Sequence, residues 1–210
     1  YKRQEVTYGY LDGFNTFLQT AHRCHHNGAI NILDCLRNFI LYCLRNEWIE
    51  KNPFKNYKLK EVAPPPKEHL TKKEIEMLIA KPMPNLRLGN VRDIFVFCCF
   101  TGLSYSDMKK LTFDHIKTSF DGDSWIVAHR QKTGTPFHIK LLPIAQQLIE
   151  NYRPTSKNNL VFPVPSVCDN MNRTLQRIAR DCGLKKHITM HMSRHTFATT
   201  VTLSQGVPLE

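Results

Sequence analysis

The chain has 210 residues, 41% of them hydrophobic, which is enough for one large or two smaller cores and argues against a wholly disordered protein. Its net charge of +11 favours an anionic partner, nucleic acid first, although a basic surface that serves only solubility is the alternative. No segment is long and apolar enough to span a membrane and no signal peptide opens the chain, so we expect a soluble, cytoplasmic protein.

The first part of the chain has the pattern of two amphipathic helices. Apolar residues recur at helical spacing from Ala29 to Leu44, and a shorter run extends from Tyr10 to Leu18. Asn27 is the expected N-cap of the longer helix, since a short polar side chain can accept a hydrogen bond from the first turn. Two such helices bury little surface, so we expect a further N-terminal helix to be missing from this fragment.

The seven cysteines indicate a reducing compartment rather than a disulfide framework, because their number is odd and no two of them have CxxC spacing. We expect those within apolar runs to be small buried core residues: Cys35, Cys43, Cys98 and Cys99.

A domain boundary is predicted after Asn52-Pro53, where the helical pattern ends. The segment that follows is polar and ends in consecutive prolines at residues 64–66. Proline cannot continue a helix and favours an extended, semi-rigid connector. Basic side chains precede the prolines: Lys55, Lys58 and Lys60.

We therefore expect a helical domain in residues 1–63, a linker in residues 64–69 and a second domain in residues 70–210. The start at Tyr1 without methionine and the stop at Glu210 in mid-pattern suggest that both domains are truncated.

The second part predicts a mainly α fold with a small antiparallel β-sheet. Thr71 and Glu74 have the spacing of a capping box. Residues 94–100 are apolar all round, which predicts a helix buried at the domain centre. Residues 125–130 and 136–141 predict a β-ribbon joined by a turn. Three helical stretches follow, at residues 143–152, 167–182 and 191 to about 204.

Three segments of the second part carry candidate chemistry: Thr-Gly-Leu-Ser-Tyr-Ser-Asp at residues 101–107, Arg-Gln-Lys-Thr-Gly at residues 130–134, and His-Met-Ser-Arg-His-Thr-Phe-Ala-Thr at residues 191–199. In this order and spacing they resemble the tyrosine recombinase, or phage integrase, family, with its TGLR-x-SE/D box, its β-hairpin lysine and its HxxRHTFAT box. The first part resembles the family's helical, SAM-like core-binding domain, including the Asn-Pro-Phe before the linker. The resemblance covers nearly the whole chain and is greatest to integrases of bacterial phages and conjugative transposons.

The resemblance implies the DNA breaking-rejoining fold and site-specific recombination, by which a mobile element integrates or excises. It implies that the complete enzyme acts through a 3′-phosphotyrosyl intermediate and a Holliday junction, without ATP, a metal ion or another cofactor. It also implies a homo-tetramer on double-stranded DNA, whereas this fragment is expected to be a monomer.

Cationic side chains suit this reaction because the attacked phosphodiester becomes a more highly charged phosphorane. Arg194 can bind two phosphate oxygens in a fork, and His191, three residues earlier, shares its helix face. The resemblance makes Lys132 the general acid that protonates the departing 5′ oxygen. Asp107 is expected to orient a cationic neighbour, and His195 either donates a hydrogen bond or packs.

Each of these residues also has an ordinary interpretation. Taken singly, Lys132 is an exposed turn lysine and Arg194 a surface arginine on a helix, but the three segments together favour the catalytic interpretation. Direct DNA contacts are expected from basic residues of both domains: Lys55, Lys58, Lys60, Arg130 and, through its hydrogen bond, His195.

The chain departs from the family's pattern at two places. Ser104 stands where the first arginine belongs and carries no charge. Our hypothesis is that Arg92 supplies the missing charge, and the alternative is an ordinary ion pair with Asp93. No tyrosine follows the third segment, the last being Tyr152. We therefore expect the fragment to bind DNA without forming a covalent adduct.

The sequence is compatible with two other functions. Histidines recur every four residues at His187, His191 and His195, a possible zinc-binding spacing, but the acidic residue of an HExxH site is absent and Arg194 would oppose a metal. A non-cleaving regulatory or accessory protein on a recombinase scaffold is the main alternative. Ser104 and the missing tyrosine favour it, whereas mere DNA binding does not need Lys132, His191 and Arg194 together.

Overall fold

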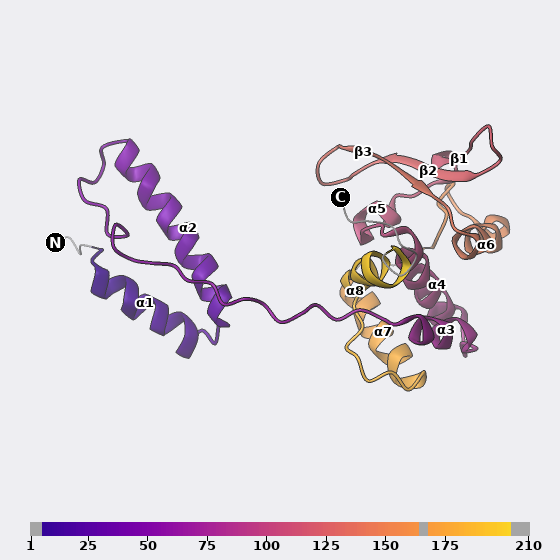
Figure 1. Cartoon of the computed structure of the whole chain (residues 1–210), viewed down its shortest axis with the longest axis horizontal. Helices are drawn as coiled ribbons and strands as arrows, with labels where there is room; N and C mark the ends of the chain where they lie inside the picture. Colours follow the sequence, from indigo (N-terminus) through magenta and orange to yellow (C-terminus); the bar gives the residue numbers. More distant parts are fainter. Residues whose placement is uncertain (1–5, 164–167, 203–210) are drawn as a thin grey trace. The chain divides into compact units, whose positions relative to one another are not determined.

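The computed structural model describes residues 6–163 and 168–202, and the chain divides after Pro66 into two compact units (Figure 1). Helices predominate, and the sheet within these described stretches is three-stranded and antiparallel. The predicted fold class, mainly α with a small antiparallel sheet, is therefore confirmed. None of the helices in the described stretches is long and apolar enough to cross a membrane.

The first unit contains a helix pair, α1 (Tyr8–Thr20) and α2 (His26–Arg45), as the apolar spacing predicted. Thr7 caps α1 by accepting a hydrogen bond from the Tyr10 amide at 3.3 Å. Phe54, from the segment after α2, completes a core of buried side chains from both helices: Leu11, Leu18, Ala29, Ile30, Leu33 and Ile40.

Asn27, the expected N-cap of α2, lies inside the helix, and His25 occupies the N-cap position without a capping side-chain bond. Asn27 instead binds the returning chain: its Nδ2 donates to the Val62 carbonyl at 2.7 Å and its Oδ1 accepts from the Val62 amide at 3.0 Å. The capping prediction was wrong because the partner of Asn27 lies 35 residues away, beyond the reach of a local pattern.

Burial of the cysteines follows the prediction except at one position. Cys43, Cys98 and Cys99 are buried, but Cys35 is exposed. Within the first unit α2 buries one face against α1, and Cys35 lies outside that shared core.

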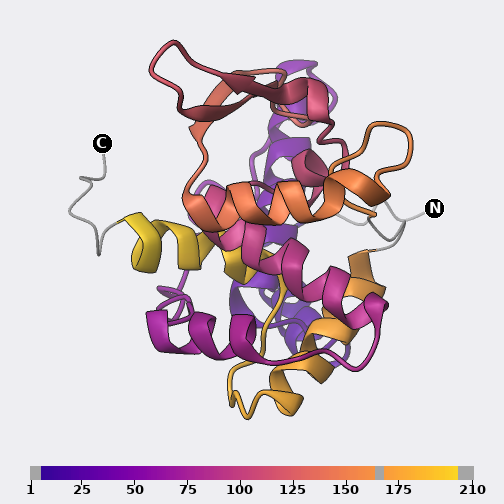
Figure 2. The same ribbon diagram turned by 90° about the vertical axis from the view of Figure 1, so that its right-hand side faces the viewer.

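The second unit is built around α4 (Leu86–Thr101), which packs against α3, α6, α7 and α8. Because α4 is enclosed, its residues 94–99 are all buried, as the apolar run at residues 94–100 predicts. The sheet lies at one end of this unit, and α3 and α7 lie at the other (Figures 1 and 2). The remaining elements are α3 (Lys72–Ala80), α5 (Tyr105–Lys109), η1 (Phe113–His115), β1 (Ile116–Thr118), β2 (Ser124–His129), β3 (Pro136–Lys140), α6 (Pro143–Tyr152), η2 (Arg153–Thr155), α7 (Cys168–Asp181), α8 (Met190–Thr196) and the π-helical η3 (Phe197–Thr202).

Local signals explain where these helices begin and end. The predicted capping box opens α3, where Thr71 Oγ1 accepts from the Glu74 amide and Glu74 Oε2 accepts from the Thr71 amide. Gly102 ends α4 in the left-handed region at φ +64°, and a Cβ there would lie 2.5 Å from Cδ1 of Phe197. The last predicted helix is present as α8 and η3, and its final positions lie outside the described residues.

The sheet has the order β1-β2-β3, and β2 with β3 forms the predicted ribbon. Ile126 of β2 is opposite Ile116 of β1 and Ile139 of β3. Ile126 is fully buried, so this face of the sheet packs on the core. The turn of the ribbon, residues 130–135, projects beyond the paired strands.

Candidate active site

Asp107, on the short helix α5, lies at the centre of the candidate site. Its Oδ2 accepts hydrogen bonds from Ser104 Oγ at 2.7 Å and Arg130 Nη1 at 3.0 Å, and its Oδ1 accepts from the Gln131 amide at 2.8 Å. Burial alone would raise the pKa of Asp107, but these hydrogen bonds and the positive charge of Arg130 outweigh burial and hold the pKa below its ordinary value. Asp107 is therefore a fixed anion that joins α5 to the root of the β-ribbon turn.

The loop between α4 and α5 brings Arg194 to the same place. Arg194, on α8, donates from Nη1 to the carbonyl of Gly102 at 3.0 Å. Two residues later, Ser104 caps α5 by accepting from the Asp107 amide at 3.2 Å. Two of the three predicted segments, residues 101–107 and 191–199, thus meet on one short loop.

His191 and His195 lie one turn apart on α8, with ring centroids 4.7 Å apart in an edge arrangement. His191 is exposed on the turn before Arg194, whereas His195 is half-buried. His195 Nε2 is buried and has no hydrogen-bond partner within the described part of the chain. Burial first, and then the charges of His191 and Lys67, lower the pKa of His195, which favours a neutral ring at neutral pH.

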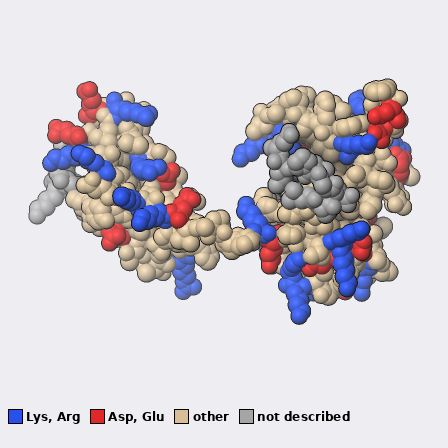
Figure 3. Space-filling model, viewed as in Figure 1, with Lys and Arg blue, Asp and Glu red and all other residues tan. Residues whose placement is uncertain are grey.

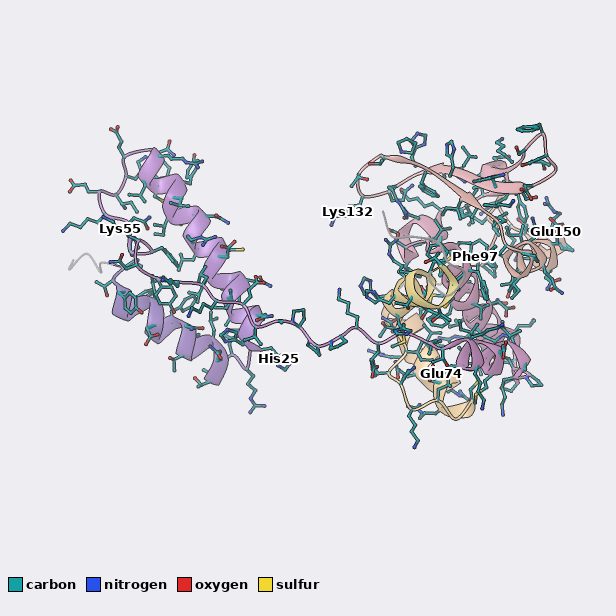
Figure 4. All side chains as sticks on the ribbon, in the orientation of Figure 1. His25, Lys55, Glu74, Phe97, Lys132 and Glu150 are labelled. Atoms are coloured by element: carbon teal, nitrogen blue, oxygen red, sulfur yellow. The ribbon has the colours of Figure 1, made fainter. Side chains whose placement is uncertain are left out.

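Lys132 stands in the β-ribbon turn, which is closed at its base. The Arg130 amide donates to the Thr135 carbonyl and the Gly134 amide donates to the Arg130 carbonyl, each at 2.8 Å. Figure 4 shows Lys132 at the tip of this turn, and its side chain is exposed. Because the Gln131 amide is bonded to Asp107, the predicted segment of residues 130–134 is joined to the other two at the root of the turn.

Arg92 is not brought to this cluster. Its guanidinium donates to Asp93 Oδ1 at 2.8 Å and to the Lys81 carbonyl at 2.8 Å. Arg92 also precedes Gly102 by ten residues of one helix, about 15 Å at 1.5 Å per residue. The ordinary ion pair that was the alternative for Arg92 is the arrangement that the structure contains.

The arginine that does reach the cluster is Arg130, which the sequence had suggested only as a DNA contact. Its guanidinium binds Asp107 and lies 4.6 Å from the ring centroid of Phe137. The sequence did not indicate that Arg130 would pair with Asp107, because the contact spans 23 residues and depends on how the sheet docks beside α5.

The three lysines expected to contact DNA from the first unit are exposed on the segment after α2: Lys55, Lys58 and Lys60. They belong to the first unit, and the Asp107 cluster belongs to the second. Figure 3 shows lysine and arginine side chains on the visible face of both units.

The histidine spacing does not make a metal site. His187 precedes α8, so it does not share a helix face with His191 and His195. Within the described residues, no group of three or more histidine, cysteine, aspartate or glutamate side chains is arranged to hold a metal ion.

Comparison with known proteins matches both units to one family. The phage integrase family matches residues 68–210, and the phage integrase SAM-like domain matches residues 2–59. The chain is 26% identical over 194 residues to the tyrosine recombinase XerD of Lacticaseibacillus casei. That match covers 85% of this chain and 64% of the relative, so the chain spans less than two-thirds of the relative's length.

Three similar solved structures are complexes with DNA. The Tn1549 transposon integrase with circular intermediate DNA is 17% identical, with a TM-score of 0.76 over 98% of this chain and 75% of that chain. XerH bound to its difH substrate is 17% identical, with a TM-score of 0.71 over 95% of this chain and 61% of that chain. A lambda integrase dimer on a COC′ core site is 13% identical, with a TM-score of 0.73 over 99% of this chain and 80% of that chain. At these identities the matches establish a shared fold.

Proposed function

Because this chain belongs to the phage integrase family, we propose that the whole protein breaks and rejoins double-stranded DNA at specific sites, integrating or excising a mobile element. The observation that carries the proposal is that the three predicted segments, two of them cationic, are joined at Asp107 and the Gly102 loop. A protein that only bound DNA would need basic surface, but not a buried carboxylate that joins Arg130 and the hairpin of Lys132 to the loop that Arg194 binds.

The arrangement suits attack on a phosphodiester. A tyrosine hydroxyl attacks phosphorus, the bond to the 5′ oxygen breaks, and a 3′-phosphotyrosyl bond replaces it. Arg194 and His191 bind the non-bridging oxygens as negative charge develops. Lys132 gives its proton to the departing 5′ oxygen. The bond energy is retained in the phosphotyrosine, so rejoining needs no cofactor.

We further propose that Arg130, rather than Arg92, replaces the arginine missing at Ser104. Ser104 Oγ and Arg130 Nη1 both contact the same oxygen, Asp107 Oδ2, at 2.7 and 3.0 Å. The guanidinium of Arg130 therefore lies beside the side chain of Ser104, close to where the family's motif places its first arginine. Asp107 is then the residue that orients this cation.

None of the described tyrosines suits the role of nucleophile. The Tyr152 hydroxyl donates to Asn90 and Asp93, and burial followed by the charge of Asp93 raises its pKa. Tyr105 packs against the core of the second unit, and the others belong to the first unit. We propose that another tyrosine is the nucleophile and that this chain alone binds DNA without cleaving it.

The proposed assignment extends to the domains and the assembly. Residues 1–63 would be the core-binding domain that contacts DNA through Lys55, Lys58 and Lys60, residues 64–69 a linker, and residues 70–210 the catalytic domain. Four protomers would act together on two DNA sites in the complete enzyme, and the present chain would be monomeric.

The test is adduct formation by the full-length protein on a nicked duplex that carries the recombination site. We expect a covalent protein–DNA band that Arg194→Ala abolishes while DNA binding persists. Binding should also weaken steeply as salt is raised, because phosphate contacts release counterions. If the full-length protein bound DNA in a salt-sensitive way but formed no adduct on any site, the proposed recombinase function would be contradicted. A regulatory DNA-binding protein would then be favoured.

A further inference from the structure

We propose that Lys110 is a positioning residue that holds the general acid Lys132 in place through Gln131, an inference that rests on the proposed recombinase function. Lys110 Nζ donates to Gln131 Oε1 at 2.5 Å, and Gln131 immediately precedes Lys132. Lys110 itself is the C-cap of α5, with its amide bonded to the carbonyls of Asp107 and Met108. The lysine thus links the end of α5 to the residue beside the catalytic one.

Gln131 makes two hydrogen bonds, and both of its partners belong to α5 or its C-cap. Its backbone amide donates to Asp107 Oδ1 at 2.8 Å, and its side chain accepts from Lys110 Nζ. One hydrogen bond fixes a position but allows rotation about it. Two bonds to a single short helix fix both the position and the direction in which the chain leaves Gln131 toward Lys132.

Packing adds little restraint at Gln131, which is exposed. A pocket at the root of the turn is lined in part by Lys110, Gln131, His129 and Phe137. The space beside Gln131 is therefore open rather than filled by side chains. Lys132 is also exposed, and its side chain makes no hydrogen bond or ion pair to the described residues. Although Arg130 packs on the Phe137 ring, the chain between Gln131 and Lys132 is oriented by polar contacts, and Lys110 supplies one of them.

The chemical consequence follows from the sensitivity of proton transfer to geometry. A general acid contributes about 10²–10⁴-fold, provided that it lies within hydrogen-bond reach of the departing oxygen. A displacement of about 1 Å is enough to lose a large part of such a contribution. We therefore expect Lys110→Met to lower the cleavage rate by about 10- to 100-fold, less than loss of Lys132 itself.

The substrate that tests this role is a duplex whose 5′ bridging oxygen is replaced by sulfur. A thiolate leaves without being protonated, so a defect confined to the general acid disappears on this substrate. In the full-length protein, Lys110→Met should be slow on the oxygen substrate and within about threefold of wild type on the sulfur substrate. Arg194→Ala should remain slow on both, because it acts on the charge of the phosphorane.

Matched variants separate the Gln131 route from other effects. Gln131→Leu removes the acceptor, and the double variant with Lys110→Met should be no slower than either single variant. Lys110→Arg keeps a donor and should recover part of the rate. Lys117→Met removes an exposed lysine from β1 of the same sheet and should leave the rate unchanged. Thermal unfolding of each variant identifies any loss of folding.

The outcomes are decisive in both directions. A Lys110→Met protein that cleaves the oxygen substrate at the wild-type rate would overturn the inference. So would an equal defect on both substrates, which would mean that Lys110 contacts the DNA phosphate directly. Cleavage by the wild type reports on the proposed function, whereas the ratio of variant to wild type reports on Lys110, so the two failures are distinguishable.

Discussion

Replacing Arg130 with alanine tests the central assignment, that a guanidinium on the β-ribbon replaces the one absent at Ser104. If Arg130 stabilises the phosphorane, its loss should lower the cleavage rate of the full-length protein by about 10²–10³-fold, the usual effect of removing one preorganised donor. If Arg130 is only a structural partner of Asp107, the cleavage rate should fall only in proportion to the fraction of protein that is unfolded at the assay temperature.

The structural contribution of Arg130 is separable from a catalytic one because it is measured as lost stability. Its ion pair joins a guanidinium side chain that is 32% exposed to the Asp107 side chain, which is 5% exposed. Arg130→Ala leaves that buried carboxylate with Ser104 and Gln131 as donors, and the lost hydrogen bond to a charged group costs about 1.5–3 kcal/mol. The contact with the Phe137 ring adds about 0.5–1 kcal/mol. Arg130→Ala should therefore cost about 2–4 kcal/mol of unfolding free energy, or about 6–12 °C in Tm for a unit of this size.

The assay combines cleavage with a rescue. Ser104→Arg in the Arg130→Ala background places a guanidinium next to the same Asp107 oxygen and should recover at least about tenfold of the lost rate. The loss of the Ser104 cap, about 1 kcal/mol, is tolerable. The assignment would be refuted if Arg130→Ala cleaved normally, or if its rate defect were matched by unfolding at the assay temperature.

Three further predictions concern the chain itself. Gly102→Ala should lower the unfolding free energy measured by urea denaturation by about 2–4 kcal/mol, because the added Cβ is strained in the left-handed backbone and clashes with the Phe197 ring. Gly134→Ala, with the same backbone but open space, should cost only the backbone part, and equal losses would contradict the packing argument. Because folding lowers the pKa of Asp107, its hydrogen bonds stabilise the chain above the unfolded pKa of about 4 and are lost as pH falls through the lower folded value. Urea denaturation should therefore show a loss of unfolding free energy between pH 6 and about 3, and Asp107→Asn should reduce that loss. If the unfolding free energy of Asp107→Asn fell with pH as steeply as that of the wild type, this role of Asp107 would be contradicted. Finally, the 210-residue chain should form no covalent adduct on nicked DNA in a denaturing gel. An adduct that Tyr105→Phe removes would show that a nucleophile is already present.

The fold was largely predictable because its signals are local. The capping box at Thr71, the apolar helix that became α4 and the β-rich runs of the ribbon are each read within a few residues. Asn27 failed for the opposite reason, since Val62, its partner, arrives from a distant part of the chain. Sequence patterns predict the structure of neighbouring residues, but they do not predict contacts between distant parts of the folded chain.

The candidate site was predictable only in part. The motif residues Arg194 and Asp107 both lie at the cluster. The choice of Arg92 as a substitute rested on its residue type and its place near the motif, and it did not allow for the rise of α4 between Arg92 and Gly102. Arg130 was named for another purpose, because only the docked sheet shows which carboxylate it meets.

The shared oxygen of Asp107 has a consequence for how such sites change over evolution. Since one carboxylate accepts hydrogen bonds from residue 104 and from residue 130, a guanidinium held there can originate at either position. A lineage that first gained arginine on the ribbon would pass through a sequence with both, and could then lose the older one without ever lacking the cation. What looks in the linear sequence like the decay of a motif would then be a relocation. Searches that require arginine in the first box would discard such lineages as inactive.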